Sequence, residues 1–296
     1  MVIPSFSCTF ATMKELIPYM MNVRGRLLDL SEPQVMGILN VTPDSFYSAS
    51  RMETEEAIRK RVRQILDEGG TMIDVGAYSS RPGADDVSEE EEMARLRRGM
   101  KVVRDEAPDV AVSVDTFRSN VAQMAVEELG ADIVNDISGG ELDEKMFQTV
   151  AKMGVPYVLT HNVKPDPLCP VGKTMQGGNQ SVLRFFAEKV QQLRDLGQKD
   201  IILDPGYGFG KTLEENYELL AHQEMLNVFE LPLLVGVSRK SMIYKLLGCT
   251  PNEALNGTTV LNTIAMQKGA SILRVHDVKE AFEVVKLYQK TLNSKL

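Results

Sequence analysis

Eight short apolar runs of this chain each end in a polar or ionisable residue, and these residues are the ones that could do chemistry. The runs are Val35–Leu39, Met72–Val75, Val110–Val114, Asp132–Val134, Pro156–Thr160, Asp200–Leu203, Pro232–Val237 and Ser271–Val275. The residues that end them are Asn40, Asp74, Asp115, Asn135 with Asp136, His161, Asp204, Ser238 to Lys240, and Arg274 with His276. Polar loops explain part of this pattern. Carboxylates, amides and cations from separate parts of a chain favour a binding or catalytic site.

The polar residues form two groups that suit two parts of one ligand. Asp115, Asn135 and Asp204 supply fixed acceptors and an amide, which a flat heterocycle with amino and lactam groups requires. The second group follows the last two runs and consists of Arg239, Lys240, Arg274 and His276. Arginine offers forked donors to an anion, and barrels often bind phosphate here, although Arg239 alone could be a salt-bridge partner. Together the groups predict a site for a nitrogen-rich ring with a phosphate-bearing tail.

The metal chemistry that the sequence allows depends on oxygen ligands. The three histidines and the separated Cys8, Cys169 and Cys249 form neither a His-Glu-x-x-His nor a Cys-x-x-Cys motif, so a protein-caged zinc is not expected. Magnesium held by one or two oxygen ligands and a substrate diphosphate is compatible with the chain. The glycines of Asp204–Lys211 either let the backbone approach a ligand or serve turn geometry alone, and both readings stay open.

The elements that must position these side chains alternate along the sequence. Amphipathic stretches with apolar residues three and four apart lie between the runs, at 55–68, 90–106, 120–129, 183–196 and 280–291. Strands alternating with helices allow an open doubly wound sheet or a closed barrel. The first loop, Asn40–Phe46, lacks the glycine-rich phosphate turn of a dinucleotide-binding sheet, which favours the barrel.

We therefore predict an α/β protein built as a single-domain (β/α)₈ TIM barrel. Residues 1–34 are predicted to be an N-terminal extension, in which a short strand or hairpin near Asn22–Ser31 plugs the barrel bottom. Residues 35–296 are predicted to be the barrel itself. No linker, repeat or low-complexity tract divides the sequence.

Composition excludes several classes of protein. The 296 residues are 43% hydrophobic and 25% charged, which is ordinary for a folded chain. The formal net charge of −8 argues against a polyanion as main partner, so we expect no nucleic-acid binding. No apolar run approaches the ~18 residues that span a bilayer, and we find no secretory signal pattern. We expect a cytoplasmic enzyme with no membrane partner.

Several motifs together resemble dihydropteroate synthase. They are Gly37–Phe46, Ile73–Gly76 with Ser79–Gly83, Ser113–Thr116, Ile133–Gly140, Leu203–Lys211, Ser238–Ile243 and Arg274–Val278. The motifs follow the family order and cover about Val35 to Val278, so their combination is highly specific. The resemblance implies a (β/α)₈ barrel, usually a homodimer, that works in folate biosynthesis. It implies condensation of p-aminobenzoate with 6-hydroxymethyl-7,8-dihydropterin diphosphate, giving 7,8-dihydropteroate and diphosphate, by Mg²⁺-assisted dissociative substitution.

The same resemblance assigns expected roles to individual residues. The pterin is expected to contact Asp115, Asn135, Asp204 and Lys240. The diphosphate is expected to bind Arg274 and His276, and Asn40 is expected to hold Mg²⁺ together with it. The p-aminobenzoate is expected to contact Phe46, Ser80, Arg81, Pro82, Phe209, Lys240 and Ser241. The residues expected to be catalytic are Asp115, Asp204, Lys240, Arg274 and His276.

The chain departs from the family pattern at two places. Ser80 replaces a threonine, which keeps the hydroxyl, and Asn162 replaces a methionine after the fifth run, which puts that loop in doubt. Two rival functions remain at this point. A pterin-dependent methyltransferase needs no diphosphate ligands, so Arg274 and His276 argue against it. A pterin-binding protein without catalysis needs neither Asn40 nor Arg81, so their presence favours the synthase.

Overall fold

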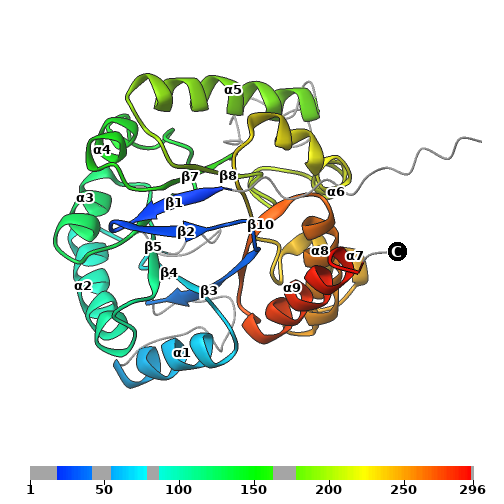
Figure 1. Ribbon diagram of the computed structural model, residues 1–296, viewed down its shortest axis with the longest axis horizontal. Helices are drawn as coiled ribbons and strands as arrows, with labels where there is room; N and C mark the ends of the chain where they lie inside the picture. Colours follow the sequence, from blue (N-terminus) through cyan, green and yellow to red (C-terminus); the bar gives the residue numbers. More distant parts are fainter. Residues whose placement is uncertain (1–18, 42–54, 79–86, 163–177, 295–296) are drawn as a thin grey trace, which may run out of the picture.

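The strands of this protein close into one parallel barrel. The computed structural model describes residues 19–41, 55–78, 87–162 and 178–294. Around the barrel the strands are β10 (Ala270–Val275), β3 (Gln34–Asn40), β4 (Met72–Gly76), β5 (Ala111–Asp115), β6 (Ile133–Asp136), β7 (Tyr157–Thr160), β8 (Ile201–Asp204) and β9 (Leu233–Val235), which pairs again with β10 (Figure 1). The eight apolar runs are these strands. The closed barrel is confirmed, and the open sheet is wrong.

Helices surround the barrel on its outside (Figure 1). They are α1 (Glu55–Asp67), α2 (Glu89–Glu106), α3 (Ser119–Glu127), α4 (Met146–Met153), α5 (Asn179–Asp195), α6 (Leu213–Ala221), α7 (Ser241–Leu247), α8 (Leu255–Gln267) and α9 (Val278–Leu292), with 3₁₀ turns η2 (Gln223–Phe229) and η3 (Pro251–Glu253). The five amphipathic stretches correspond to α1, α2, α3, α5 and α9. Local chemistry sets the helix ends: the Ser88 hydroxyl accepts from the Glu91 N–H at the start of α2, and Gly154, at φ 67°, ends α4.

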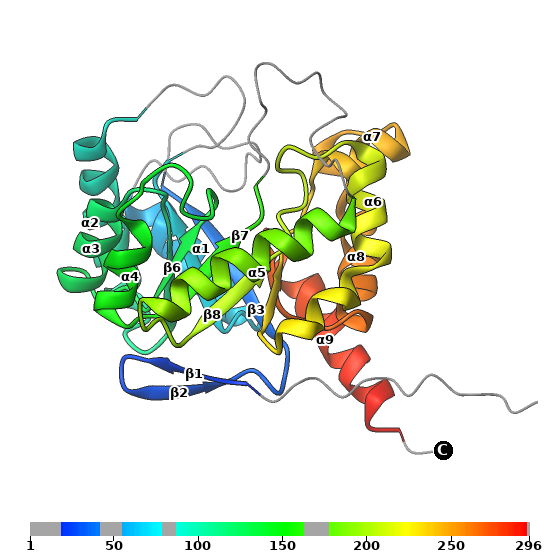
Figure 2. The ribbon, with the colours of Figure 1, turned by 90° about the horizontal axis from the view of Figure 1, so that it is seen from above.

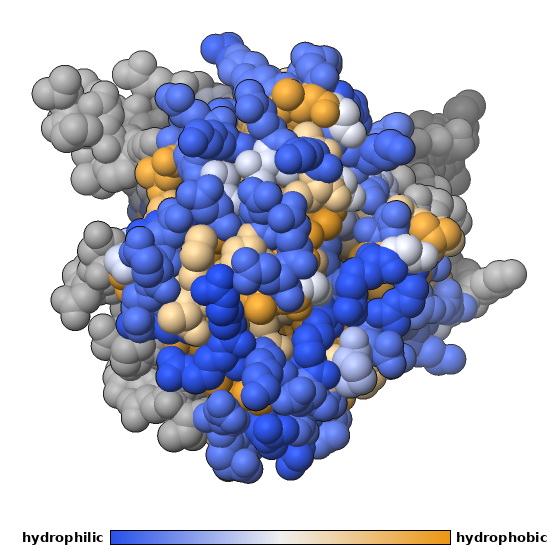
Figure 3. All heavy atoms as spheres, turned by 90° about the vertical axis from the view of Figure 1, so that its left-hand side faces the viewer, coloured by the Kyte–Doolittle hydropathy of each residue, from blue (hydrophilic) through white to orange (hydrophobic). Residues whose placement is uncertain are grey.

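The outer surface of these helices is mainly polar. The side of the molecule that carries α2 and α3 is mostly hydrophilic, with small, separate apolar patches (Figure 3). Within the described residues, the longest apolar helical stretches fall short of what a bilayer span requires.

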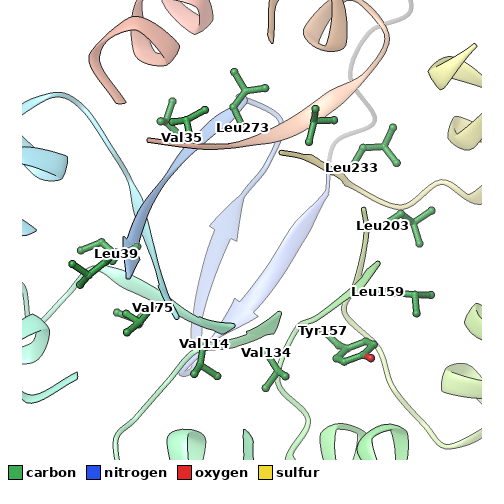
Figure 4. Packing of buried hydrophobic residues seen from close by; sticks show 14 of the residues in the cluster. Val35, Leu39, Val75, Val114, Val134, Tyr157, Leu159, Leu203, Leu233 and Leu273 are labelled. Carbon is green, nitrogen blue, oxygen red and sulfur yellow. The ribbon is translucent and has the colours of Figure 1, made fainter. Parts of the chain in front are cut away.

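The barrel strands divide their side chains between two cores, because successive residues of a strand point to opposite sides. Val75, Val114 and Leu203 point outward and pack under the helices (Figure 4). The inward-facing residues near the strand starts are also apolar, and Met72 and Ile272 belong to this second core. Two positions further along, these two strands carry the polar Asp74 and Arg274 on the same inner face. The barrel interior is therefore apolar at its bottom and more polar toward the carboxyl ends of the strands.

A two-stranded hairpin closes the apolar end of the barrel. β1 (Met20–Val23) and β2 (Arg26–Asp29) pair antiparallel through a turn at Arg24 and Gly25, whose φ angles of 49° and 77° suit a type I′ turn. Figure 2 shows the hairpin lying across the barrel end. Met21 is fully buried and packs with the lower interior core, while Arg24 forms an ion pair with the buried Asp132. The expected plug is therefore present, whereas the domain division at residues 34 and 35 stays a prediction.

We expect Met21→Ala to lower the free energy of unfolding by about 2–4 kcal/mol, because truncating a buried methionine leaves a cavity in the lower core. The neighbouring Met20, whose side chain is 55% exposed on the other face of β1, is the matched control. Met20→Ala should change stability by less than about 0.5 kcal/mol. Urea unfolding followed by circular dichroism measures both, and equal losses would show that the hairpin does not seal the barrel.

Candidate active site

Polar side chains from several strands meet in the upper barrel interior. They extend from the carboxyl-terminal halves of the strands and include Asp74 on β4, Asp115 on β5, Asn135 on β6, Asp204 on β8 and Arg274 on β10. Asp74 and Asn135 are almost completely buried, at 0% and 2% exposure. Because burying such groups is costly unless they are paired, their partners define the site.

Arg274 is the centre of a three-residue ion pair. Its Nε donates to Asp74 Oδ2 at 2.6 Å, and its Nη2 donates to Asp115 Oδ2 at 2.7 Å. The Asn135 amide donates to the same Asp74 oxygen at 3.1 Å. Although burial opposes it, the attraction of Asp74 and Asp115 keeps the pKa of Arg274 above its usual value. Asp74 thus links Asn135 of the predicted pterin set to Arg274 of the predicted diphosphate set, and Arg274 in turn contacts Asp115.

Burial raises the pKa values of two site carboxyl groups, those of Asp115 and Asp204. The pKa of Asp115 is raised to about 7, mainly by desolvation, with Arg274 opposing the shift and Asp74 adding to it. Desolvation also raises the pKa of Asp204, although Lys240 counteracts it and the Gly206 N–H donates to Asp204 Oδ1 at 2.8 Å. Small changes around Asp115 can therefore change its charge at neutral pH.

The loop after β8 brings Lys240 and Phe209 together beside Asp204. The Lys240 ammonium lies 4.5 Å from the centroid of the Phe209 ring and donates to the Tyr207 carbonyl. Desolvation lowers the pKa of Lys240 to about 8, while Asp204 favours its charged form. Ser241 is the first residue of α7 and directly follows Lys240. The structure thus brings these predicted residues to one side of the site.

A half-buried lysine that the sequence did not single out holds the shape of this loop. Lys211 Nζ donates to the carbonyls of His161 at 2.9 Å, Gly206 at 2.8 Å and Phe209 at 3.3 Å. Gly206 has a φ of +67°, and an added Cβ would lie 2.1 Å from the His161 carbonyl oxygen. Turn geometry and close packing therefore require glycine at position 206.

Arg239, after β9, and His276, after β10, have different surroundings. Arg239 forms a two-pronged ion pair with Asp277 and donates to the Pro251 carbonyl at 2.9 Å, which matches the salt-bridge alternative for this residue. The backbone N–H of His276 donates to Ser238 Oγ at 3.2 Å. Desolvation and the nearby cations, Arg274 first among them, lower the pKa of His276 to about 3. His276 is therefore a neutral hydrogen-bonding group at pH 7, not a cation.

Asn162, the departure after β7, has a defined partner. Its side-chain amide donates to the Ile137 carbonyl at 2.9 Å, so it ties the end of β7 to the loop after β6. The adjacent His161 packs edge-on against Phe185, and desolvation lowers the pKa of His161 to about 3. Four predicted contacts of the second substrate, Phe46, Ser80, Arg81 and Pro82, lie outside the described residues.

The described residues hold no group of three or more His, Cys, Asp or Glu side chains arranged for a metal ion. Asn40 is the one predicted ligand, and Gly76 beside it keeps space open. A Cβ at Gly76 would lie 3.2 Å from Asn40 Oδ1 and 3.8 Å from Asp115 Oδ2. Asn40 therefore presents a neutral oxygen next to a carboxylate, a donor set that suits Mg²⁺ only when the substrate adds further oxygens.

Two residues of the site are absent from the predicted set. Asp74 was expected only as the end of the second run, and Lys211 was assigned no role. The available signal for Asp74 was a carboxylate within the otherwise apolar Met72–Val75 run. A buried strand tolerates such a residue only when a cation or donors from other strands satisfy it.

Comparison with known proteins agrees with this fold and site. The profile of the family described as "Pterin binding enzyme" matches residues 36–276. The dihydropteroate synthase of Escherichia coli (strain K12) is 41% identical over 281 residues, which are 92% of this chain and 96% of that protein. The Yersinia pestis dihydropteroate synthase in a sulfonamide drug complex superposes with a TM-score of 0.85 at 38% identity, covering 93% of this chain and 100% of that one.

A third relative carries a ligand. The Xanthomonas albilineans dihydropteroate synthase with 4-aminobenzoic acid matches at a TM-score of 0.82 and 32% identity, over 94% of this chain and 100% of that one. The fold and the polar barrel interior are thus those of a pterin-binding (β/α)₈ enzyme. The chain belongs to the dihydropteroate synthase family, whose members are transferases of folate biosynthesis.

We expect the Asp115 carboxyl group to titrate near pH 7, and Arg274→Gln to raise this pKa further because the neutral amide no longer stabilises the carboxylate. Carbon-13 NMR of protein labelled at aspartate carboxyl groups measures both values. Arg239→Gln is the matched control, since Arg239 pairs with Asp277 instead and should leave the Asp115 titration unchanged. An inflection near the ordinary value of about 4 would contradict the desolvation of this site.

Proposed function

We propose that this enzyme condenses 6-hydroxymethyl-7,8-dihydropterin diphosphate with p-aminobenzoate, forming 7,8-dihydropteroate and releasing diphosphate. The observation that carries the proposal is the polar interior of the upper barrel, where acceptors and one arginine converge. A flat pterin ring needs buried acceptors for its N–H groups, and its diphosphate needs donors at the open end. The 4-aminobenzoic acid bound to the Xanthomonas relative supports the identity of the second substrate.

The pterin is proposed to bind between β5, β6 and β8. Asp115 and Asp204 would accept from its ring N–H and amino groups, and the buried Oδ1 of Asn135, which has no hydrogen-bond partner among the described residues, would accept another donor. The Lys240 ammonium would donate to a ring acceptor. These hydrogen bonds would replace the ones that the ring makes with water, and so would compensate for its desolvation.

The difficult step is breaking the bond between the pterin methylene carbon and the diphosphate oxygen. Arg274 and His276 would donate hydrogen bonds to the diphosphate, so that its growing negative charge is stabilised as the bond breaks. The electron pair of that bond leaves with the diphosphate, and the electron-rich dihydropterin shares the positive charge left on the methylene. Asp115 and Asp204 would offset this charge electrostatically, which makes a dissociative substitution the preferred path.

The neutral amine of p-aminobenzoate is already a nucleophile, so no strong general base is needed to activate it. Its nitrogen forms the new carbon–nitrogen bond, and the resulting ammonium group gives up one proton to the released diphosphate or to water. Phe209, Lys240 and Ser241 are proposed to line this second substrate next to the pterin, which the contact of Lys240 with the Phe209 ring and the position of Ser241 at the start of α7 support. Phe46, Ser80, Arg81 and Pro82 are proposed to complete its site. When bound, Mg²⁺ would neutralise charge on the diphosphate, and Asn40 is the side chain proposed to hold it.

We further propose a cytoplasmic homodimer. The side of the molecule that carries α7 and α8 exposes Leu246, Leu247 and Val260 at 56%, 59% and 48%. Exposed apolar side chains on neighbouring helices are a common feature of subunit interfaces. Sedimentation of the purified protein at several concentrations tests this assembly.

An assay of diphosphate release with and without p-aminobenzoate tests the proposed reaction. The synthase should release diphosphate from the pterin diphosphate only when p-aminobenzoate is present. A pterin-binding protein without catalysis would bind the substrate and release none, and a methyltransferase would have no turnover with this pair. Release independent of the amine would refute the proposal.

Asp204→Asn should lower turnover in this assay by at least about 10²-fold, the usual effect of losing one aligned electrostatic group.

We expect Mg²⁺ to bind the protein measurably only together with diphosphate or the pterin diphosphate, because one neutral amide oxygen is too weak a site alone. Calorimetric titration of Mg²⁺ into protein with and without diphosphate measures this dependence. Asn40→Ala should weaken the metal binding seen with diphosphate, whereas Asn22→Ala, in the hairpin at the opposite end, is the control. Tight binding of Mg²⁺ to the free protein would contradict the assignment.

A further inference from the structure

Asp74 contacts two ligand-facing side chains at once, although it belongs to no predicted ligand set. Its side chain is fully buried on β4. A single oxygen, Oδ2, accepts from Arg274 Nε at 2.6 Å and from the Asn135 amide nitrogen at 3.1 Å. Arg274 comes from β10 and Asn135 from β6, which lie on either side of β4 in the barrel. One carboxylate therefore connects the arginine expected to bind diphosphate with the amide expected to bind the ring.

The chemistry of Asp74 decides which way the Asn135 amide faces. A carboxylate paired with a guanidinium is a pure acceptor, so only the NH₂ end of the amide can lie against it. The carbonyl oxygen of Asn135 is then turned away from Asp74. This oxygen is buried and has no hydrogen-bond partner among the described residues. A buried acceptor without a partner is costly, and a ligand N–H would satisfy it.

Asp74 restricts Arg274 in a similar way. With Nε held by Asp74 and Nη2 by Asp115, the plane of the guanidinium is fixed by two carboxylates from neighbouring strands. An arginine held through two of its donors loses less rotamer freedom when it binds an anion. If a ligand takes Asp115, the bond to Asp74 still keeps the guanidinium in place.

We propose that Asp74 is a positioning residue that presents Asn135 as an acceptor for a ring N–H and holds Arg274 for the phosphate-bearing end of the same ligand. The inference rests on the proposed pterin diphosphate substrate, and it adds a residue through which both ends of that substrate are recognised together. The proposed effect of Asp74 is exerted through these two side chains. A purely structural role as a buried salt bridge is the alternative, and it predicts loss of stability without loss of recognition.

Asp74→Asn tests the inference against a matched control. Asp132→Asn is the control, because it also removes a fully buried carboxylate. Asp132 pairs with Arg24 and Arg104 at the bottom of the barrel. Calorimetric titration with the pterin diphosphate should give at least about 10-fold weaker binding for Asp74→Asn. Asp132→Asn should bind within about twofold of the unaltered protein, even if it unfolds at a lower temperature. Equal binding by all three proteins would overturn the inference.

A second measurement isolates the part that acts through Asn135. In protein that already carries Asn135→Ala, adding Asp74→Asn should weaken binding of 6-hydroxymethylpterin, which has no diphosphate, by less than about threefold. In protein that retains Asn135, Asp74→Asn should weaken binding of 6-hydroxymethylpterin by at least about 10-fold. If Asp74→Asn weakened binding by the same factor in both backgrounds, Asp74 would not act through Asn135.

The outcomes separate this inference from the proposed function. If the unaltered protein and Asp132→Asn do not bind the pterin diphosphate, the proposed function fails. If both bind it and Asp74→Asn binds it equally well, only the role of Asp74 fails. Asp74→Ser, which also removes the charge, replaces Asp74→Asn if the latter does not fold. Failure of both Asp74 variants to fold, under conditions where Asp132→Asn is folded, would assign Asp74 to structural support.

Discussion

The buried ion pair of Arg274 with Asp74 and Asp115 is the interaction on which the polar half of the barrel depends. None of these charges could be buried alone, because an isolated ion in the interior costs far more than the fold can offset. Arg274 lies on β10, and its partners lie on β4 and β5, across the intervening β3. The site therefore exists only when the barrel is closed, since closure brings the last strand within reach of these two strands.

The apolar lower half makes this arrangement possible. The inward side chains near the strand starts pack with Met21, Val23 and Leu30 of the N-terminal segment, so water is kept from the lower interior. Strands such as β4, β6, β8 and β10 thus contribute apolar residues below and polar residues above on the same inner face. The stability of the barrel and the chemistry of its open end are assigned to different ends of the same strands, as in other barrels of this class.

Desolvation gives the site an electrostatic balance that a ligand can change. It raises the pKa of Asp115 to about 7 and lowers the pKa of Lys240 to about 8, so both groups are close to changing charge at neutral pH. Each is held in its charged form mainly by a neighbour of opposite sign. In the proposed complex, a bound ring or diphosphate would replace part of these internal pairs, and the new contacts would offset the energy needed to separate them. Desolvation first, and the nearby cations second, lower the pKa of His276 and keep it neutral.

The sequence by itself determined the eight strands, the plug at the barrel bottom and the family, because strand periodicity, turn glycines and contiguous motifs are local features. It also placed Asp115, Asn135, Asp204 and Arg274 at strand ends, where barrel geometry brings residues together. Only the tertiary structure decided which side chains pair with one another. Asp74 holds an amide from β6 and an arginine from β10, and burial, not residue type, sets the charge of His276. Pairing across strands and desolvation depend on distances that a linear sequence does not contain.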